Sequence, residues 1–170
     1  MEPVTWGFVG TLLGVIVGAS SSILTTIITA RNNRKIQQDK NSYERSEKAR
    51  EFQRENFIKL QDSLTNIARL ITKAHLEDVQ YFRKNPDSKS RPMLSNELDN
   101  EIRVSNTNVA ILIERVANDM LRNNINMLHS EMTNVLMTKN ERDSTSALNQ
   151  AHSLFQSVMK DIGSALRQHY

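Results

Sequence analysis

Residues 3–30 read PVTWGFVGTLLGVIVGASSSILTTIITA and contain no charged side chain. The run ends at Arg31, the first residue of the basic sequence RNNRK. At a rise of about 1.5 Å per residue, roughly 20 residues of α-helix cross the apolar core of a bilayer. Backbone amides in lipid must bond within their own segment, so a single span of this length has to be helical. We therefore predict a transmembrane anchor over residues 1–30.

Small residues recur at every fourth position of this predicted span. Helices associate in bilayers where small side chains let their backbones approach, because lipid tails are as apolar as leucine. The spacing predicts a face for self-association, and hence a homo-oligomer, although glycine is also frequent in spans in general. The residues that share this face are Gly10, Gly14, Gly18, Ser22 and Thr26.

A cleavable signal peptide is the alternative interpretation of the same run, with Val17-Gly18-Ala19 as its cleavage site. Signal peptides begin with basic residues and end their apolar region at the cleavage site. Here the amino end carries Glu2 and no Lys or Arg, and apolar residues continue past Ala19. The sequence therefore favours an anchor that is retained.

The positive charge of the chain is concentrated directly after the apolar run. Residues 31–60 hold nine Lys or Arg and five Asp or Glu, a net charge of +4, whereas the whole chain has a net charge of +3. Basic residues beside a span stay on the cytoplasmic side, so we expect a short amino terminus outside and the remainder in the cytosol. The same residues attract anionic lipid. Because residues 61–170 are neutral overall, we expect no DNA binding.

The remainder of the chain is predicted to be all-α, with a bundle carried on a stalk. Aromatic residues make up 5 % of the chain, prolines number three, and cysteine is absent, which fits a reducing compartment. Residues 31–56 alternate in charge and have little apolar surface, which is typical of a solvated helical stalk. From Phe57 onward apolar residues recur at helical spacing. We expect a helical sensor and oligomerisation domain over residues 57–170.

Apolar stripes and turn signals divide this predicted domain. The first stripe is Phe57, Leu60, Leu64, Ile67, Ile71 and Ala74. Pro86 and Pro92 frame the clearest break, and a second helix is expected from about Ser95. Residues 95–138 form either one long helix, kinked near Arg122-Asn123-Asn124, or two short ones. A last helix follows a charged turn, and its candidate caps are Asp143, Ser144 and Thr145. Whether the core closes within one chain stays open.

The sequence lacks the motifs of enzymes. It has no Gly-rich phosphate loop, no His-Glu-x-x-His and no Gly-x-Ser-x-Gly. The histidines show no ligand spacing, and we expect them at the surface or rim: His75, His129, His152 and His169. Methionines that follow the apolar stripes are expected in the core: Met120, Met127, Met132, Met137 and Met159. We predict no enzyme, no metal site and no cofactor.

Two polar clusters are candidates for binding an anionic ligand. Arginine pairs with phosphate, asparagine with an adenine edge, and symmetric assembly would repeat each cluster around an axis. A solvated loop and a polar helix face are the simpler explanations of the two clusters. The first cluster lies at the proline-framed break and comprises Arg83, Lys84, Lys89 and Arg91. The second comprises Arg115, Asn118 and Arg122, predicted to share one helical face, with Asn123 beside them.

The layout resembles the small membrane effectors of type III CRISPR defence. The apolar span at Pro3–Ala30, the basic stop at Arg31–Lys35 and a helical domain of suitable size carry this resemblance. It implies a bacterial inner-membrane protein that binds a cyclic oligoadenylate and perturbs the membrane in antiviral defence. The chain also resembles the b subunit of rotary ATP synthases, but the Pro86–Pro92 break departs from that unbroken stalk. The competing hypothesis is a membrane-tethered helical scaffold that binds a protein partner.

Overall fold

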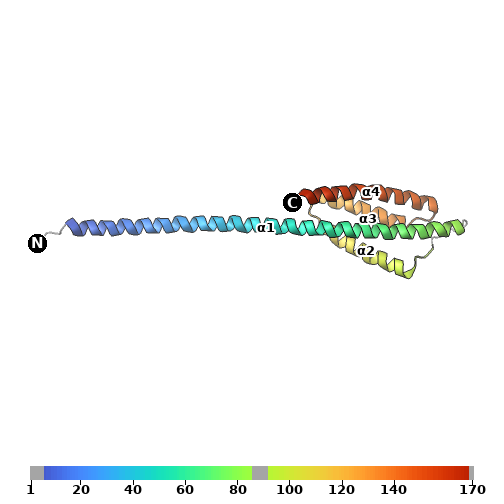
Figure 1. Cartoon of the computed structure of the whole chain (residues 1–170), viewed down its shortest axis with the longest axis horizontal. Coiled ribbons are helices and arrows are strands. Elements are labelled where there is room, and N and C mark those ends of the chain that lie inside the picture. Colours follow the sequence, from blue (N-terminus) through green and yellow to red (C-terminus); the bar gives the residue numbers. More distant parts are fainter. Residues whose placement is uncertain (1–5, 86–91, 169–170) are drawn as a thin grey trace. The chain divides into compact units, whose positions relative to one another are not determined.

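The structure is a computed structural model that describes residues 6–85 and 92–168. Within these ranges the chain forms α-helices and no strand, which confirms the all-α prediction for the described part. Figure 1 shows the four helices in chain order: α1 (Trp6–Lys84), α2 (Asn96–Glu114), α3 (Asp119–Val135) and α4 (Glu141–Gln168). The chain divides into two units, Met1–Lys48 and Ala49–Tyr170.

The first unit consists of the amino-terminal part of α1. Its side chains are exposed from Gly7 to Ser46, including the apolar ones. Among the described residues, α1 is the one helix that is long and apolar enough to cross a membrane, judged by length and composition. An apolar helix with no protein core to bury its side chains is what a lipid-facing segment requires.

Polar side chains in this apolar segment bond back to their own helix. Thr11 Oγ1 donates to the Gly7 carbonyl at 2.8 Å, and Thr26 Oγ1 donates to the Ser22 carbonyl at 2.9 Å. In a lipid environment these bonds would satisfy hydroxyl groups that find no partner among lipid tails. A Cβ atom added at Gly10, Gly14 or Gly18 would meet no atom within 4 Å, so the face that they share is open within this chain.

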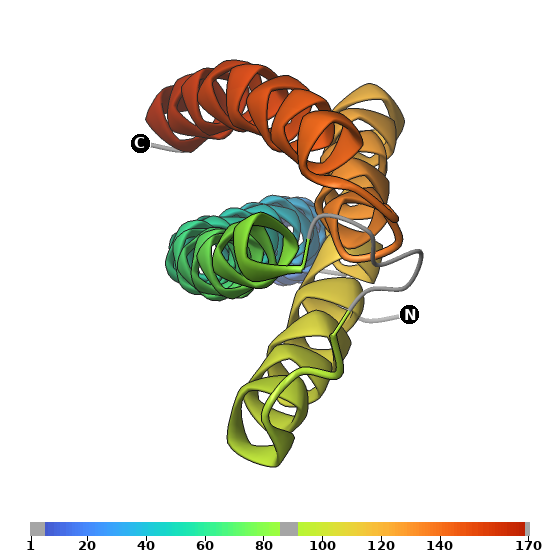
Figure 2. The same cartoon turned by 90° about the vertical axis from the view of Figure 1, so that its right-hand side faces the viewer.

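The second unit is an up-down-up-down four-helix bundle that includes the carboxyl-terminal part of α1. Figure 2 shows α2, α3 and α4 arranged around this part of α1. Side-chain bonds fix the order and direction of the helices. Gln53 of α1 donates to the Arg115 carbonyl at 2.8 Å and accepts from the Ala117 amide at 3.1 Å, so it holds the turn that follows α2. At the other end Arg83 of α1 reaches Glu141 of α4.

The core of the bundle closes within one chain. The predicted stripe on α1 is buried throughout, with Phe57 2 % exposed and Leu60, Leu64 and Ile67 fully buried. Burying such a side chain contributes about 1.5–3 kcal/mol to stability. The buried apolar side chains therefore account for the association of the helices. The buried residues that the other three helices contribute include Leu98, Ile102, Val109, Leu112, Ile125, Leu128, Met132, Val135, Ala151, Val158 and Ile162.

Residues 95–138 form two helices, and the break lies earlier than the predicted kink at Arg122–Asn124. The α2 helix ends at Glu114, and Asn118 caps α3 by accepting a hydrogen bond from the Leu121 amide at 2.9 Å. Asparagine is among the preferred amino-terminal caps because its side chain satisfies a free amide of the first turn. Ser95 caps α2 in the same way by accepting from the Leu98 amide at 3.3 Å, and α2 begins near Ser95 as predicted.

The cap predicted for the last helix is wrong. Asn140 Oδ1 accepts a hydrogen bond from the Asp143 amide at 2.9 Å, and α4 begins at Glu141. Asp143, Ser144 and Thr145 therefore lie inside α4, and Ser144 is fully buried. A serine that faces the core is unavailable as a cap.

Most of the methionines predicted for the core are exposed. Met132 is buried and Met159 half-buried, whereas Met120, Met127 and Met137 are 76 %, 58 % and 69 % exposed. Met120 precedes the buried row of α3 that begins at Leu121. Because α2 ends before Met120, the buried apolar residues of α2 do not continue at the same helical spacing into α3.

Candidate functional site

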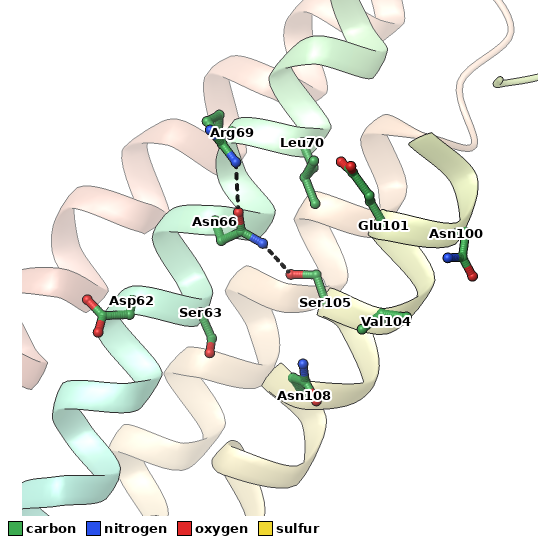
Figure 3. A pocket seen from close by; sticks show the side chains of 10 residues that line it. All are labelled: Asp62, Ser63, Asn66, Arg69, Leu70, Asn100, Glu101, Val104, Ser105 and Asn108. Carbon is green, nitrogen blue, oxygen red and sulfur yellow. Dashed lines mark hydrogen bonds between the residues drawn. The ribbon is translucent and has the colours of Figure 1, made fainter. Parts of the chain in front are cut away.

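Two neighbouring hollows lie between α1 and α2 in the bundle. The first has a volume of about 590 Å³ and is shown in Figure 3. The α1 helix lines it with Asp62, Ser63, Asn66, Arg69 and Leu70, and α2 lines it with Asn100, Glu101, Val104, Ser105 and Asn108. Amides, hydroxyls and charges of both signs therefore meet beside two apolar side chains.

The second hollow continues the first along the same pair of helices. It has a volume of about 380 Å³ and shares Ser63 and Asn108 with the first. Its other lining residues are Lys59, Ile111, Leu112 and Arg115. We call the two hollows together the α1/α2 groove.

The floor of the groove is ordered by hydrogen bonds that Figure 3 shows as dashed lines. Arg69 Nη2 donates to Asn66 Oδ1 at 3.1 Å, and Asn66 Nδ2 donates across the groove to Ser105 Oγ at 3.3 Å. Asn108 makes no side-chain hydrogen bond within the described residues and is exposed. Its amide is free to donate two hydrogen bonds and to accept others from a ligand.

Charge is distributed unevenly along the groove. The carboxylates of Asp62 and Glu101 line the larger hollow together with the guanidinium of Arg69. Arg115 lines the smaller hollow together with Lys59, which also pairs with Glu55 at 3.5 Å, and this hollow has no carboxylate in its lining. Val104 and Ile111, 51 % and 48 % exposed, add apolar surface along α2. The groove thus offers one basic end, one mixed and more acidic end, and apolar surface on one side.

The groove exists because polar residues replace apolar ones where α1 faces α2. Asn56 and Leu112 hold one end together, since Asn56 Nδ2 donates to the Leu112 carbonyl at 3.1 Å. Further along, Ser63, Asn66, Ser105 and Asn108 line the larger hollow, and these side chains do not fill the space between the helices. Sequence reasoning missed this site because its residues lie on two helices and form no motif on either.

Two residues of the first predicted ligand cluster, Arg83 and Lys84, lie within the described ranges. Arg83 forms an ion pair with Glu141, with its Nη2 and Nε 2.8 and 3.1 Å from Glu141 Oε1. This hydrogen bond and the charge of Glu141 raise the pKa of Arg83 above its ordinary value. Lys84 is exposed in the last turn of α1. Lys89 and Arg91 lie outside the described residues.

The second predicted cluster does not share a helical face, because the chain breaks within it. Arg115 follows the end of α2 and lines the α1/α2 groove. Asn118 caps α3, and Arg122 donates to the Val116 carbonyl at 2.6 and 2.9 Å and pairs with Asp119 at 2.8 Å. Asn123 is exposed. Of these four residues, Arg115 alone lines the groove.

One histidine differs from the predicted surface or rim positions, and the described others agree with them. His75 is buried, and its Nδ1 lies 2.7 Å from the Ser144 hydroxyl. His129 is half-buried, its Nε2 lies 2.9 Å from Asn106 Oδ1, and burial lowers its pKa. His152 is exposed, and His169 lies outside the described residues. Within the described ranges no group of three His, Asp or Glu side chains is placed to hold a metal ion.

Comparison of the chain with protein-family models, with curated proteins and with solved structures found no match. Two features of the molecule bear on its function. One is the apolar amino-terminal segment of α1, and the other is the α1/α2 groove.

Proposed function

We propose that the protein is a membrane-anchored recognition protein whose helical bundle binds a protein partner in the α1/α2 groove. The observation that carries this proposal is the composition of the groove. The groove carries amides, two ends of different charge, and the exposed apolar side chains of Val104 and Ile111. It therefore suits a partner surface that carries both charges and apolar side chains. Polypeptides have that mixture, and complementary charges steer and orient such complexes.

A partner protein suits the groove better than a ligand with several phosphates. Asp62 and Glu101 would repel phosphates in the larger hollow. Arg83 and Arg122, which the sequence suggested for phosphate binding, already pair with Glu141 and Asp119. Such a ligand would have to break these pairs or bind elsewhere.

In this proposal the recognition surface is held on the cytosolic side of the membrane. The basic residues from Arg31 to Lys35 favour the cytoplasmic side, and we propose a single pass through the inner membrane of a bacterium. The open face at Gly10, Gly14 and Gly18 supports a homo-oligomer in the bilayer. Several grooves would then be held near one another, and a partner with repeated binding segments would bind with increased avidity.

Site-specific photo-crosslinking in native membranes tests the proposal. A photoreactive residue replaces Val104 at the groove, or Met127, which is similarly exposed on α3, as the control. We expect a crosslinked partner from position 104 and not from position 127. The additional change Arg115→Glu should remove that product, because it reverses the charge at the basic end. Identical products from both positions would contradict a specific groove interaction.

A second candidate function is the membrane effector that binds a cyclic oligoadenylate or another anionic messenger. It is favoured by the smaller hollow, where Lys59 and Arg115 stand beside the amide of Asn108. Basic groups and an amide are the chemistry that binds a phosphate and a base. In this function, messenger binding would alter the packing of the membrane segments and so perturb the membrane during antiviral defence.

Thermal unfolding of the full chain in detergent, with and without a panel of cyclic nucleotides, tests this second function. A ligand present at about 100 times its dissociation constant stabilises a protein by about 2.7 kcal/mol. Arg115→Gln should abolish the stabilisation, whereas Arg142→Gln, at an exposed position of α4, should preserve it. If no cyclic nucleotide of the panel changes the unfolding temperature, the messenger function is contradicted and the protein partner remains as the proposed function.

A further inference from the structure

We propose that the α1/α2 groove binds its partner as an extended peptide whose main chain is recognised by asparagine side chains. This inference rests on the proposed function and specifies the part of the partner that enters the groove. It starts from Asn66 on α1 and Asn108 on α2, which line the same hollow from opposite helices.

An asparagine amide matches the peptide group in hydrogen-bonding capacity. It offers donors and an acceptor side by side, and an extended peptide presents an N–H and a C=O on each residue. Asn108 has no side-chain partner within the described part of the chain, and Asn66 is oriented by Arg69 and Ser105. The groove therefore presents one free amide opposite one that is held in place.

A docked helix would satisfy these groups poorly. The main-chain groups in the middle of a helix bond to one another, so they are unavailable to Asn108 and Ser63. Covering polar side chains without giving them partners is unfavourable. An extended segment brings unpaired main-chain groups and avoids this penalty, as in strand-type peptide recognition.

The charged ends of the groove set the length and direction of the peptide. Glu101 on α2 and Arg115 directly after its last residue lie fourteen positions apart, which is about 21 Å along the helix axis. An extended chain rises about 3.3 Å per residue, so about six residues cover this distance. The peptide should carry a basic side chain near Glu101 and a carboxylate near Lys59 and Arg115. Its apolar side chains would contact Val104 and Ile111.

The test uses the full chain in lipid nanodiscs and a displayed library of linear eight-residue peptides. Selected peptides are then measured against the parent protein, against Asn108→Leu and against Asn149→Leu. Asn149 is an exposed asparagine on α4 and serves as the matched control. Each peptide is also synthesised with single N-methyl groups, which remove one main-chain donor at a time.

We expect enriched peptides with a basic residue toward one end and an acidic residue toward the other. Asn108→Leu should weaken their binding by about tenfold, the effect of losing one or two hydrogen bonds. Asn149→Leu should leave binding within about twofold of the parent. One N-methyl position should weaken binding by about tenfold, because its donor faces an asparagine.

Three results would overturn the inference: no enriched peptide, binding that is insensitive to Asn108→Leu, or tolerance of N-methylation at every position. Circular dichroism of Asn108→Leu checks that the bundle remains folded. If a partner still crosslinks specifically from position 104, the proposed function stands and the extended-peptide mode is wrong. If neither peptides nor a specific crosslink are found, the groove is not a recognition site.

Discussion

His75 of α1 and Ser144 of α4 share a hydrogen bond of 2.7 Å between Nδ1 and Oγ, and both side chains are buried. The two residues are 69 positions apart in the sequence. A polar pair inside an apolar core fixes the register of its two helices, because sliding either helix would separate the partners. The pair therefore specifies how the start of α4 packs on the end of α1.

We predict that Ser144→Ala destabilises the bundle by about 1–2 kcal/mol, because it removes this hydrogen bond from a buried histidine. Ser146→Ala, at an exposed position of the same helix, is the matched control and should change stability by less than about 0.5 kcal/mol. Chemical unfolding of the full chain in detergent measures both. Equal effects of the two substitutions would show that the buried bond contributes nothing specific.

Arg122 is predicted to have a structural role in the turn between α2 and α3. Arg122→Gln removes its bonds to the Val116 carbonyl and its pair with Asp119, and should cost about 1–2 kcal/mol in unfolding free energy. Asn123→Ala, at the exposed neighbour, should cost less than about 0.5 kcal/mol. If Arg122→Gln left the unfolding free energy unchanged, the guanidinium would instead be available for a ligand.

The apolar pattern was sufficient to predict the helices and much of the core. Phe57, Leu60 and Leu64 recur at helical spacing and are buried as expected. The break after α2 was harder to predict because it contains neither proline nor glycine. The residue that marks this break is Asn118, whose side chain accepts a hydrogen bond from the Leu121 amide and so caps α3. In the sequence alone, a capping asparagine cannot be distinguished from any other exposed polar residue.

The candidate site could not be predicted from the sequence, because it depends on which helices are neighbours. Asn66 and Ser105 are 39 positions apart, and no local pattern indicates that they face each other. The same reason explains why the burial of His75 was not predicted, because its hydrogen-bond partner Ser144 lies on another helix. The sequence indicates Arg115 as part of a helical face that the break removes, and Arg115 nevertheless lines the groove.

His129 should make stability depend on pH. Burial lowers its pKa in the folded protein below the ordinary value of 6.5, so the unfolded chain binds the proton more readily. The stability that neutral His129 contributes is fully present above about pH 6.5. It is lost as the pH falls through the pKa of His129 in the folded protein. Unfolding at pH 7.5, 6.5 and 5.5 should show a loss of stability toward acid that is smaller in His129→Gln. An equal loss in both proteins would assign the acid sensitivity to other groups.

Gly14→Leu tests the predicted face for self-association in the apolar segment of α1. The Cβ of Gly14 would meet nothing within this chain, so the substitution should leave the helix intact. Against a second copy, a leucine side chain would hold the two backbones apart and weaken their association. Ile16→Leu is the control, because two positions turn the side chain by about 200° to the opposite face. Energy transfer between labelled chains in vesicles should fall for Gly14→Leu and persist for Ile16→Leu. If both variants associate as well as the parent, the oligomer uses another surface or the chain is a monomer.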